Sequence, residues 1–138
     1  VHSLPSIWAI PSQIRQLFQN LLSNSLKFSK PGQQPKVVLY SDAVHGSEVQ
    51  KNNRAMEENY SRIFIKDDGI GFDPKYAEEI FIVFKRLHSH HEFDGTGIGL
   101  SICKKIMEKH KGFIEAQSQP DNGSTFVVLF PQKIPVLV

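Results

Sequence analysis

Two glycine-rich segments constrain the fold of this chain more than any other feature. Residues 67–72 read Asp-Asp-Gly-Ile-Gly-Phe, and residues 95–100 read Gly-Thr-Gly-Ile-Gly-Leu. Alternating Ile63 and Ile65 predict a strand before the first segment, and the spacing of Leu100, Cys103 and Ile106 predicts a helix after the second. Glycine lets a backbone approach a ligand closely, and a helix N-terminus offers free N–H groups to phosphate. Five glycines in two such arrays favour a phosphate site over loops that need glycine only to turn.

Two common phosphate-binding motifs do not fit these segments. The chain contains no G-x-x-x-x-G-K-[ST] sequence, which excludes a P-loop. The second segment reads G-x-G-x-G, which differs from the dinucleotide-binding G-x-G-x-x-G, and no strand immediately precedes it.

Composition is that of one soluble globular domain spanning residues 1–138. Hydrophobic residues make up 40% and charged residues 22% of the chain, and the net charge of +2 is too small to indicate nucleic acid. No apolar run approaches the roughly 20 residues that span a bilayer, and no signal peptide is visible, so we expect a cytoplasmic domain without direct membrane contact. The single cysteine, Cys103, fits a reducing compartment and is expected to be a buried structural thiol.

The order of the expected elements predicts an α+β two-layer sandwich, with a mixed, mostly antiparallel sheet packed on three helices. The helices are expected to begin at Pro11, at Asp73 as an N-cap, and after the second glycine segment. Residues 42–60 are expected to be a long polar connection, and residues 84–95 a loop that closes over a ligand. The expected strands are residues 7–10, 36–41, 62–66, 112–118 and 124–130.

The first helix carries a polar stripe beside its apolar one. Asn20, Asn24 and Lys27 lie at i, i+4 and i+7, about 120° around the helix from the stripe that includes Leu17 and Leu21. Asparagine is a poor helix former, so two of them on one stripe suggest a binding role, with a solvated face as the alternative.

These segments, taken in order, resemble the catalytic ATP-binding domain of sensor histidine kinases, in the Bergerat-fold group that includes DNA gyrase, mismatch-repair ATPases and a heat-shock chaperone. Residues 20–28 resemble the N box, 67–71 the first glycine box and 81–84 the F box. Residues 95–100 resemble the second glycine box, and 123–126 a remnant of the third. The resemblance covers nearly the whole chain.

The resemblance implies ATP and Mg²⁺ as ligands and gives roles to individual residues. Asp67 would accept a hydrogen bond from the adenine amino group, and Phe28 would lie near the ring. Asn24 would coordinate Mg²⁺, with Asn20 beside the same metal, and Lys27 would meet the phosphates. Asn20 and Lys27 are the implied catalytic residues. The remaining residues expected at the nucleotide are Gly69, Gly71, Lys85, Arg86, Gly95, Thr96, Gly97, Gly99, Leu100 and Thr125.

The chain departs from the family in two respects. Ser25 stands where alanine is common, a change that we expect to be tolerated. A helical dimerisation domain with the phosphorylated histidine is not recognisable, and none of the six histidines lies in an acceptor motif. The implied partners are that dimerisation domain, within a homodimeric parent protein that could itself be membrane-anchored, and the receiver domain of a response regulator.

Three other functions remain open from the sequence. An ATP hydrolase of the same fold normally has glutamate at the position of Asn20, and an amide cannot act as a general base. The intact Asn24, Asp67 and glycine boxes argue against a nucleotide-binding regulatory module without chemistry, because decay usually reaches these residues first. A serine kinase of the anti-sigma-factor type fits the F box and lid less well.

Overall fold

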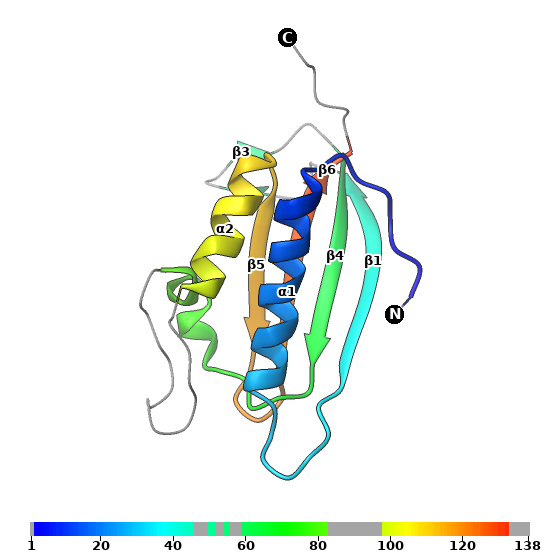
Figure 1. Ribbon diagram of the computed structural model, residues 1–138. Helices are drawn as coiled ribbons and strands as arrows, with labels where there is room; N and C mark the ends of the chain where they lie inside the picture. The colour runs from blue at the N-terminus through cyan, green and yellow to red at the C-terminus, as the bar shows by residue number, and fades with distance from the viewer. Residues whose placement is uncertain (1, 46–49, 52–53, 56–58, 83–97, 133–138) are drawn as a thin grey trace.

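The structure is a computed structural model that describes residues 2–45, 50–51, 54–55, 59–82 and 98–132. Its main sheet has four strands in the order β1-β4-β6-β5, all antiparallel (Figure 1). The strands are β1 (Val37–His45), β4 (Asn59–Asp67), β5 (Phe113–Ser118) and β6 (Ser124–Pro131). A separate pair, β2 (Gln50–Lys51) and β3 (Arg54–Ala55), lies between β1 and β4 in the chain.

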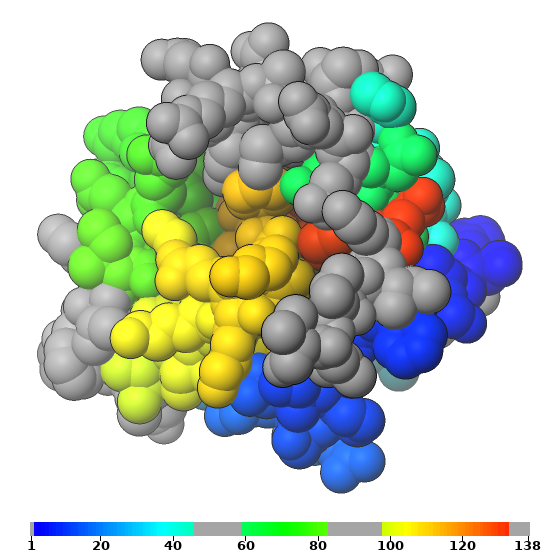
Figure 2. Space-filling view, turned by 90° about the horizontal axis from the view of Figure 1, so that it is seen from above, coloured from blue at the N-terminus to red at the C-terminus, as the bar shows by residue number. Residues whose placement is uncertain are grey.

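Helices α1 (Pro11–Lys27) and α2 (Gly99–Lys109) pack together against one face of the sheet. In the view from above, α2 (yellow) and α1 (blue) lie on the same side of the molecule (Figure 2). The core between the layers contains Leu17 and Leu21 of α1, Met107 of α2, Ile65 of β4 and Phe126 of β6. This arrangement confirms the α+β class and the apolar stripe of the first helix.

The predicted sheet and the predicted helix after Asp73 are both wrong in part. All pairings in the four-stranded sheet are antiparallel, so the sheet is not mixed. The predicted helix after Asp73 is two single 3₁₀ turns, η2 (Pro74–Tyr76) and η3 (Glu79–Phe81), so two α-helices rather than three cover the sheet in the described chain. Asp73 is an N-cap as expected, because its side chain accepts a hydrogen bond from the Lys75 N–H. A segment this short has little helical stability of its own, so burial of Ile80 and Phe81 in the core decides its backbone.

The connection between β1 and β4, predicted to span residues 42–60, is shorter in the structure. Strand β1 continues to His45 and β4 begins at Asn59, in a register that sets Asp42 opposite Arg62 and Val44 opposite Tyr60. Arg62 Nε donates to Asp42 Oδ1 at 2.8 Å, and Tyr60 is buried on the sheet face away from the helices. Cross-strand pairs of this kind stabilise a hairpin although the segment is polar.

Residues 7–10 are not a strand. Ile10 is locally extended because a residue before proline avoids the helical region, but it pairs with no strand. Its N–H instead donates to His110 Nε2 at 3.0 Å, just beyond the end of α2. The other ring nitrogen, Nδ1, lies 2.8 Å from the Ile106 carbonyl oxygen, so Nδ1 carries the proton. His110 therefore connects Ile10, the residue before α1, to the C-terminal end of α2 through two hydrogen bonds.

No helix in the described part of the chain is long and apolar enough to cross a membrane.

Candidate nucleotide site

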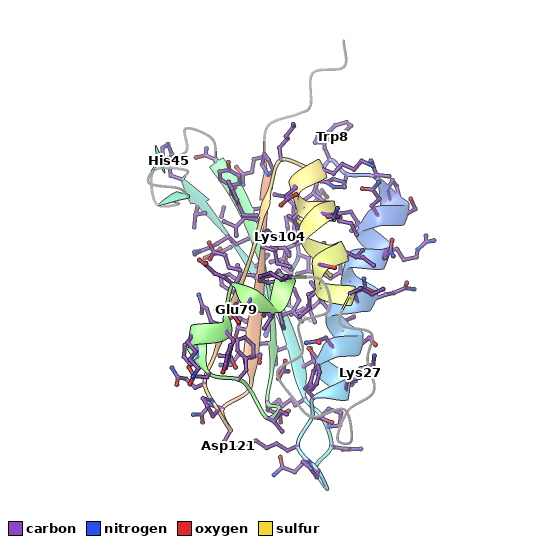
Figure 3. All side chains as sticks on the ribbon, turned by 90° about the vertical axis from the view of Figure 1, so that its left-hand side faces the viewer. Trp8, Lys27, His45, Glu79, Lys104 and Asp121 are labelled. Atoms are coloured by element: carbon purple, nitrogen blue, oxygen red, sulfur yellow. The ribbon has the colours of Figure 1, made fainter. Side chains whose placement is uncertain are left out.

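Three segments meet at one end of the sandwich, at the bottom of Figure 1. They are the last turn of α1, the end of β4 with the loop after it and the β5–β6 turn, while α2 begins higher up, beside Asn20 in the middle of α1. Figure 3 shows Lys27 and Asp121 at this end, and Trp8 and His45 at the opposite end. Most of the sequence-predicted residues that the structure describes lie at this end.

Asp67 is the buried carboxylate of the site, with 7% of the residue exposed. Its Oδ1 accepts hydrogen bonds from the Gly69 N–H at 2.9 Å and the Ser124 N–H at 3.2 Å. Burial raises the pKa of the Asp67 carboxyl, and these two bonds oppose that rise. Both backbone donors therefore bind the same carboxylate oxygen, Oδ1.

Ser25 lies beside Asp67, and the sequence analysis treated it only as a tolerated replacement. It is fully buried on α1, its Oγ lies 3.2 Å from the Leu21 carbonyl oxygen, and its hydroxyl also lowers the pKa of the Asp67 carboxyl. Its place on the buried stripe of the helix, one turn after Leu21, was visible in the sequence. What the sequence could not show is that this stripe points at the end of β4.

The first glycine box serves close packing of backbones. A Cβ on Gly69 would collide with the Phe28 carbonyl oxygen, and one on Gly71, where φ is +68°, would collide with the Gln119 carbonyl oxygen. Between them, the Ile70 N–H donates to the Phe28 carbonyl at 2.9 Å, and the Ile70 carbonyl accepts from the Asp121 N–H at 2.7 Å. The loop is thus held between the end of α1 and the β5–β6 turn, with Phe28 at the junction.

Asn20, the first residue of the polar stripe of α1, lies beside the start of α2. Asn20 Nδ2 donates to the Gly99 carbonyl oxygen at 3.3 Å, which leaves the amide oxygen for another partner. Asn20 also contacts the thiol of Cys103, which is fully buried and whose pKa burial raises to about 12, as expected for a structural thiol. Asn24 is half-buried one turn later, and Lys27 is exposed in the last turn.

Helix α2 begins at the site with Gly99 and Leu100. Its N-cap, Ile98, makes no side-chain hydrogen bond to the first turn. Gly99, the first residue of α2, lies beside Asn20 of the α1 stripe, and the N-terminal end of a helix suits an anion. Five predicted site residues lie outside the described residues: Lys85, Arg86, Gly95, Thr96 and Gly97.

Thr125 does not lie with the other site residues. It alternates with Phe126, which faces the helices, and it stands opposite Lys66 on the other face of the sheet. Ser124 instead stands opposite Asp67 and gives it a backbone N–H. Strand alternation from the apolar Phe126 could have identified Ser124 from the sequence.

Comparison with known proteins places this site in a family. Residues 9–134 match the model of the histidine kinase-, DNA gyrase B- and HSP90-like ATPases. The chain therefore belongs to this ATPase family. More closely, it is an ATP-binding catalytic domain of the sensor histidine kinase type, as the similar proteins below indicate.

Two curated relatives illustrate the match. The phytochrome-like protein Cph1 of Synechocystis is 40% identical over 131 residues, which are 95% of this chain and 16% of that protein. The adaptive-response sensory kinase SasA of Prochlorococcus marinus is 34% identical over 129 residues, which are 93% of this chain and 30% of that protein. The chain thus spans well under half the length of these relatives.

Solved structures share the fold. The catalytic domain of histidine kinase ThkA has a TM-score of 0.66 at 26% identity, covering 91% of this chain and 71% of that one. Full-length ShkA in complex with AMPPNP has a TM-score of 0.69 at 24% identity, covering 96% of this chain and 24% of that one.

Proposed function

We propose that this domain binds ATP with Mg²⁺ and supplies the γ-phosphate to a histidine on a partner dimerisation domain, in the manner of two-component signalling. The observation that carries the proposal is Asp67, a buried carboxylate fixed through Oδ1 at the end of β4, beside Ser25 of α1. A fixed carboxylate acceptor selects a ligand that presents a donor, such as the adenine amino group. The ShkA complex with AMPPNP contains a protein of this fold with that nucleotide analogue bound.

The stripe on α1 fits a magnesium ion. Asn20 is oriented by its bond to the Gly99 carbonyl, so its amide oxygen remains as a ligand, and Asn24 offers a second one turn later. Amide oxygens suit this hard cation, which keeps several of its waters. When bound, Mg²⁺ would neutralise phosphate charge, and Lys27 would add a point charge beside it. Phosphoryl transfer depends mainly on such positioning and charge neutralisation.

Direct hydrolysis of ATP is the second candidate function, and Asn20 argues against it. The amide at this position cannot deprotonate water, and its nitrogen donates a hydrogen bond to the Gly99 carbonyl oxygen. We therefore expect slow phosphate release. The chain would act as one domain of a homodimeric parent protein, on the cytoplasmic side where ATP is supplied, with a response regulator receiving the phosphate afterwards.

The test is incubation of the chain with γ-labelled ATP, with and without a histidine-bearing dimerisation domain. We expect ATP binding without self-labelling for the chain alone, and acid-labile, base-stable label on the added domain. Strong label on the isolated chain would point to a self-modifying kinase, and rapid phosphate release would point to a hydrolase. Absence of ATP binding would contradict the proposal altogether.

A further inference from the structure

We propose that Ser118 is a positioning residue for Asp67 and thereby a determinant of adenine binding, although it does not contact Asp67 itself. The inference rests on the proposed function, since it concerns the adenine end of the same site. Ser118 is the last residue of β5 and stands opposite Ser124, the first residue of β6.

The Ser118 hydroxyl contacts three different groups. Its Oγ accepts from the Phe72 N–H at 2.8 Å and donates to the Gly123 carbonyl oxygen at 2.7 Å. It also lies 3.0 Å from Ser124 Oγ. A serine hydroxyl has one proton, and here that proton goes to Gly123. Ser124 must therefore be the donor in the contact between the two hydroxyls, and this fixes the orientation of both hydroxyl groups.

These contacts hold the two segments that bind Asp67. One is the loop that begins with Gly69 and ends with Phe72, and the other is the turn that leads from Gly123 into Ser124. Gly123 packs so closely on the Asp67 carbonyl oxygen that a Cβ would not fit there. A small shift of either segment would thus move an N–H away from Asp67 Oδ1. The Ser118 side chain thus links the loop to the turn, in addition to the Asp67 carboxylate and the bond from the Asp121 N–H to the Ile70 carbonyl.

The experiment measures ATP binding by calorimetry for Ser118→Ala and for a control, Ser41→Ala. Ser41 also donates its hydroxyl to a backbone carbonyl, that of Ser3 at 3.0 Å, but on the edge strand. We expect Ser118→Ala to weaken ATP binding about three- to tenfold, the range of one ordinary hydrogen bond, and Ser41→Ala to leave it unchanged. Ser118→Thr keeps a hydroxyl and should restore most of the affinity.

Two double variants separate positioning of Asp67 from general loosening of the fold. In an Asp67→Asn background, Ser118→Ala should cause little further loss, because the acceptor it positions is already changed. In an Asn24→Ala background, which alters the metal end, the full loss should persist. Equal losses in both backgrounds, or wild-type affinity in Ser118→Ala, would overturn the inference. If Ser118→Ala does not fold, Ser118→Cys with its weaker donor carries the same comparison. A wild-type chain that binds no ATP would contradict the proposed function instead.

Discussion

The Asn20 side chain of α1 donates a hydrogen bond to the Gly99 carbonyl oxygen at the first residue of α2, across 3.3 Å. The bond joins the two helices at the end where the nucleotide is expected, and it decides which atom of the amide remains free for a cation. A residue implied in catalysis is thus also part of the helix–helix contact.

Replacing Asn20 by aspartate should destabilise the nucleotide-free chain by about 1–2 kcal/mol. The variant loses the amide donor and sets a carboxylate against the Gly99 carbonyl oxygen, which is also an acceptor. Urea denaturation measures the free energy of unfolding. Gln19→Glu is a matched control, because it makes the same amide-to-acid change at an exposed neighbour. Equal losses in the two variants would mean that the Asn20–Gly99 bond contributes nothing to stability.

Asp67 should make stability depend on pH in a direction unusual for an acid. Its pKa is raised by burial above the unfolded value, so the folded chain holds the proton more tightly than the unfolded chain between the two pKa values. The protonated Asp67 side chain therefore contributes fully to the free energy of unfolding below the unfolded pKa of 3.8. This contribution is lost as the pH rises through the folded pKa. The unfolding free energy of Asp67→Asn, compared with that of the wild type, should therefore be most favourable at pH values above the folded pKa of Asp67.

The measurement is thermal or urea unfolding of wild type and Asp67→Asn from pH 3 to 8. Asp121→Asn is the control, since Asp121 is an exposed turn residue at the same end of the molecule. A difference between wild type and Asp67→Asn that stays constant with pH would contradict the raised pKa.

Gly123→Ala should cost more stability than Gly32→Ala, although both residues have positive φ, +74° and +77°. An alanine at either position pays roughly 1–2 kcal/mol for the left-handed conformation. At Gly32 a Cβ would meet open space, whereas at Gly123 it would collide with the Asp67 carbonyl oxygen. Unfolding free energies of the two variants isolate the steric part. Equal values would show that the backbone at Gly123 moves aside freely.

His110→Phe should release the entry of α1 while keeping an aromatic ring beside Phe130. The His110 and Phe130 rings are edge-to-face at 6.2 Å, a contact that phenylalanine can retain, but phenylalanine has no acceptor for the Ile10 N–H. We expect faster amide hydrogen exchange at Ile10 and little change in the strands. His2→Phe serves as the control, and unchanged exchange at Ile10 would mean that other groups protect it.

The sequence was sufficient for features that depend on local pattern. The apolar stripe containing Leu17 and Leu21, the N-cap at Asp73 and the turn before Ser124 follow from periodicity and turn chemistry, and the structure has all three. Cys103 is buried, as its place on the second helix predicted.

Features that depend on distant partners could not be read from the sequence. The apolar run at residues 7–10 suggested a strand, but the Ile10 N–H donates to His110, a hundred residues away in the sequence. The serines at positions 25, 118 and 124 are unremarkable by composition. The register of β4, β5 and β6 sets Ser124 opposite Asp67 and Ser118 opposite Ser124, and the packing of α1 on the sheet brings Ser25 to Asp67. Thr125 was predicted one residue away from the side chain that lies at the site.

The position of β6 between β4 and β5 has a consequence for synthesis of the chain. Asp67 leaves the ribosome long before Ser124. The position of the Asp67 side chain nevertheless depends on the hydrogen bond from the Ser124 N–H, and its backbone packs against Gly123. Until β6 is made, β4 is an edge strand with one side unpaired, and an unpaired edge can pair with other chains. The end of the site that we propose for adenine is therefore completed last. A nascent chain stopped before residue 124 would have the N box and first glycine box but would lack the Ser124 N–H that binds Asp67.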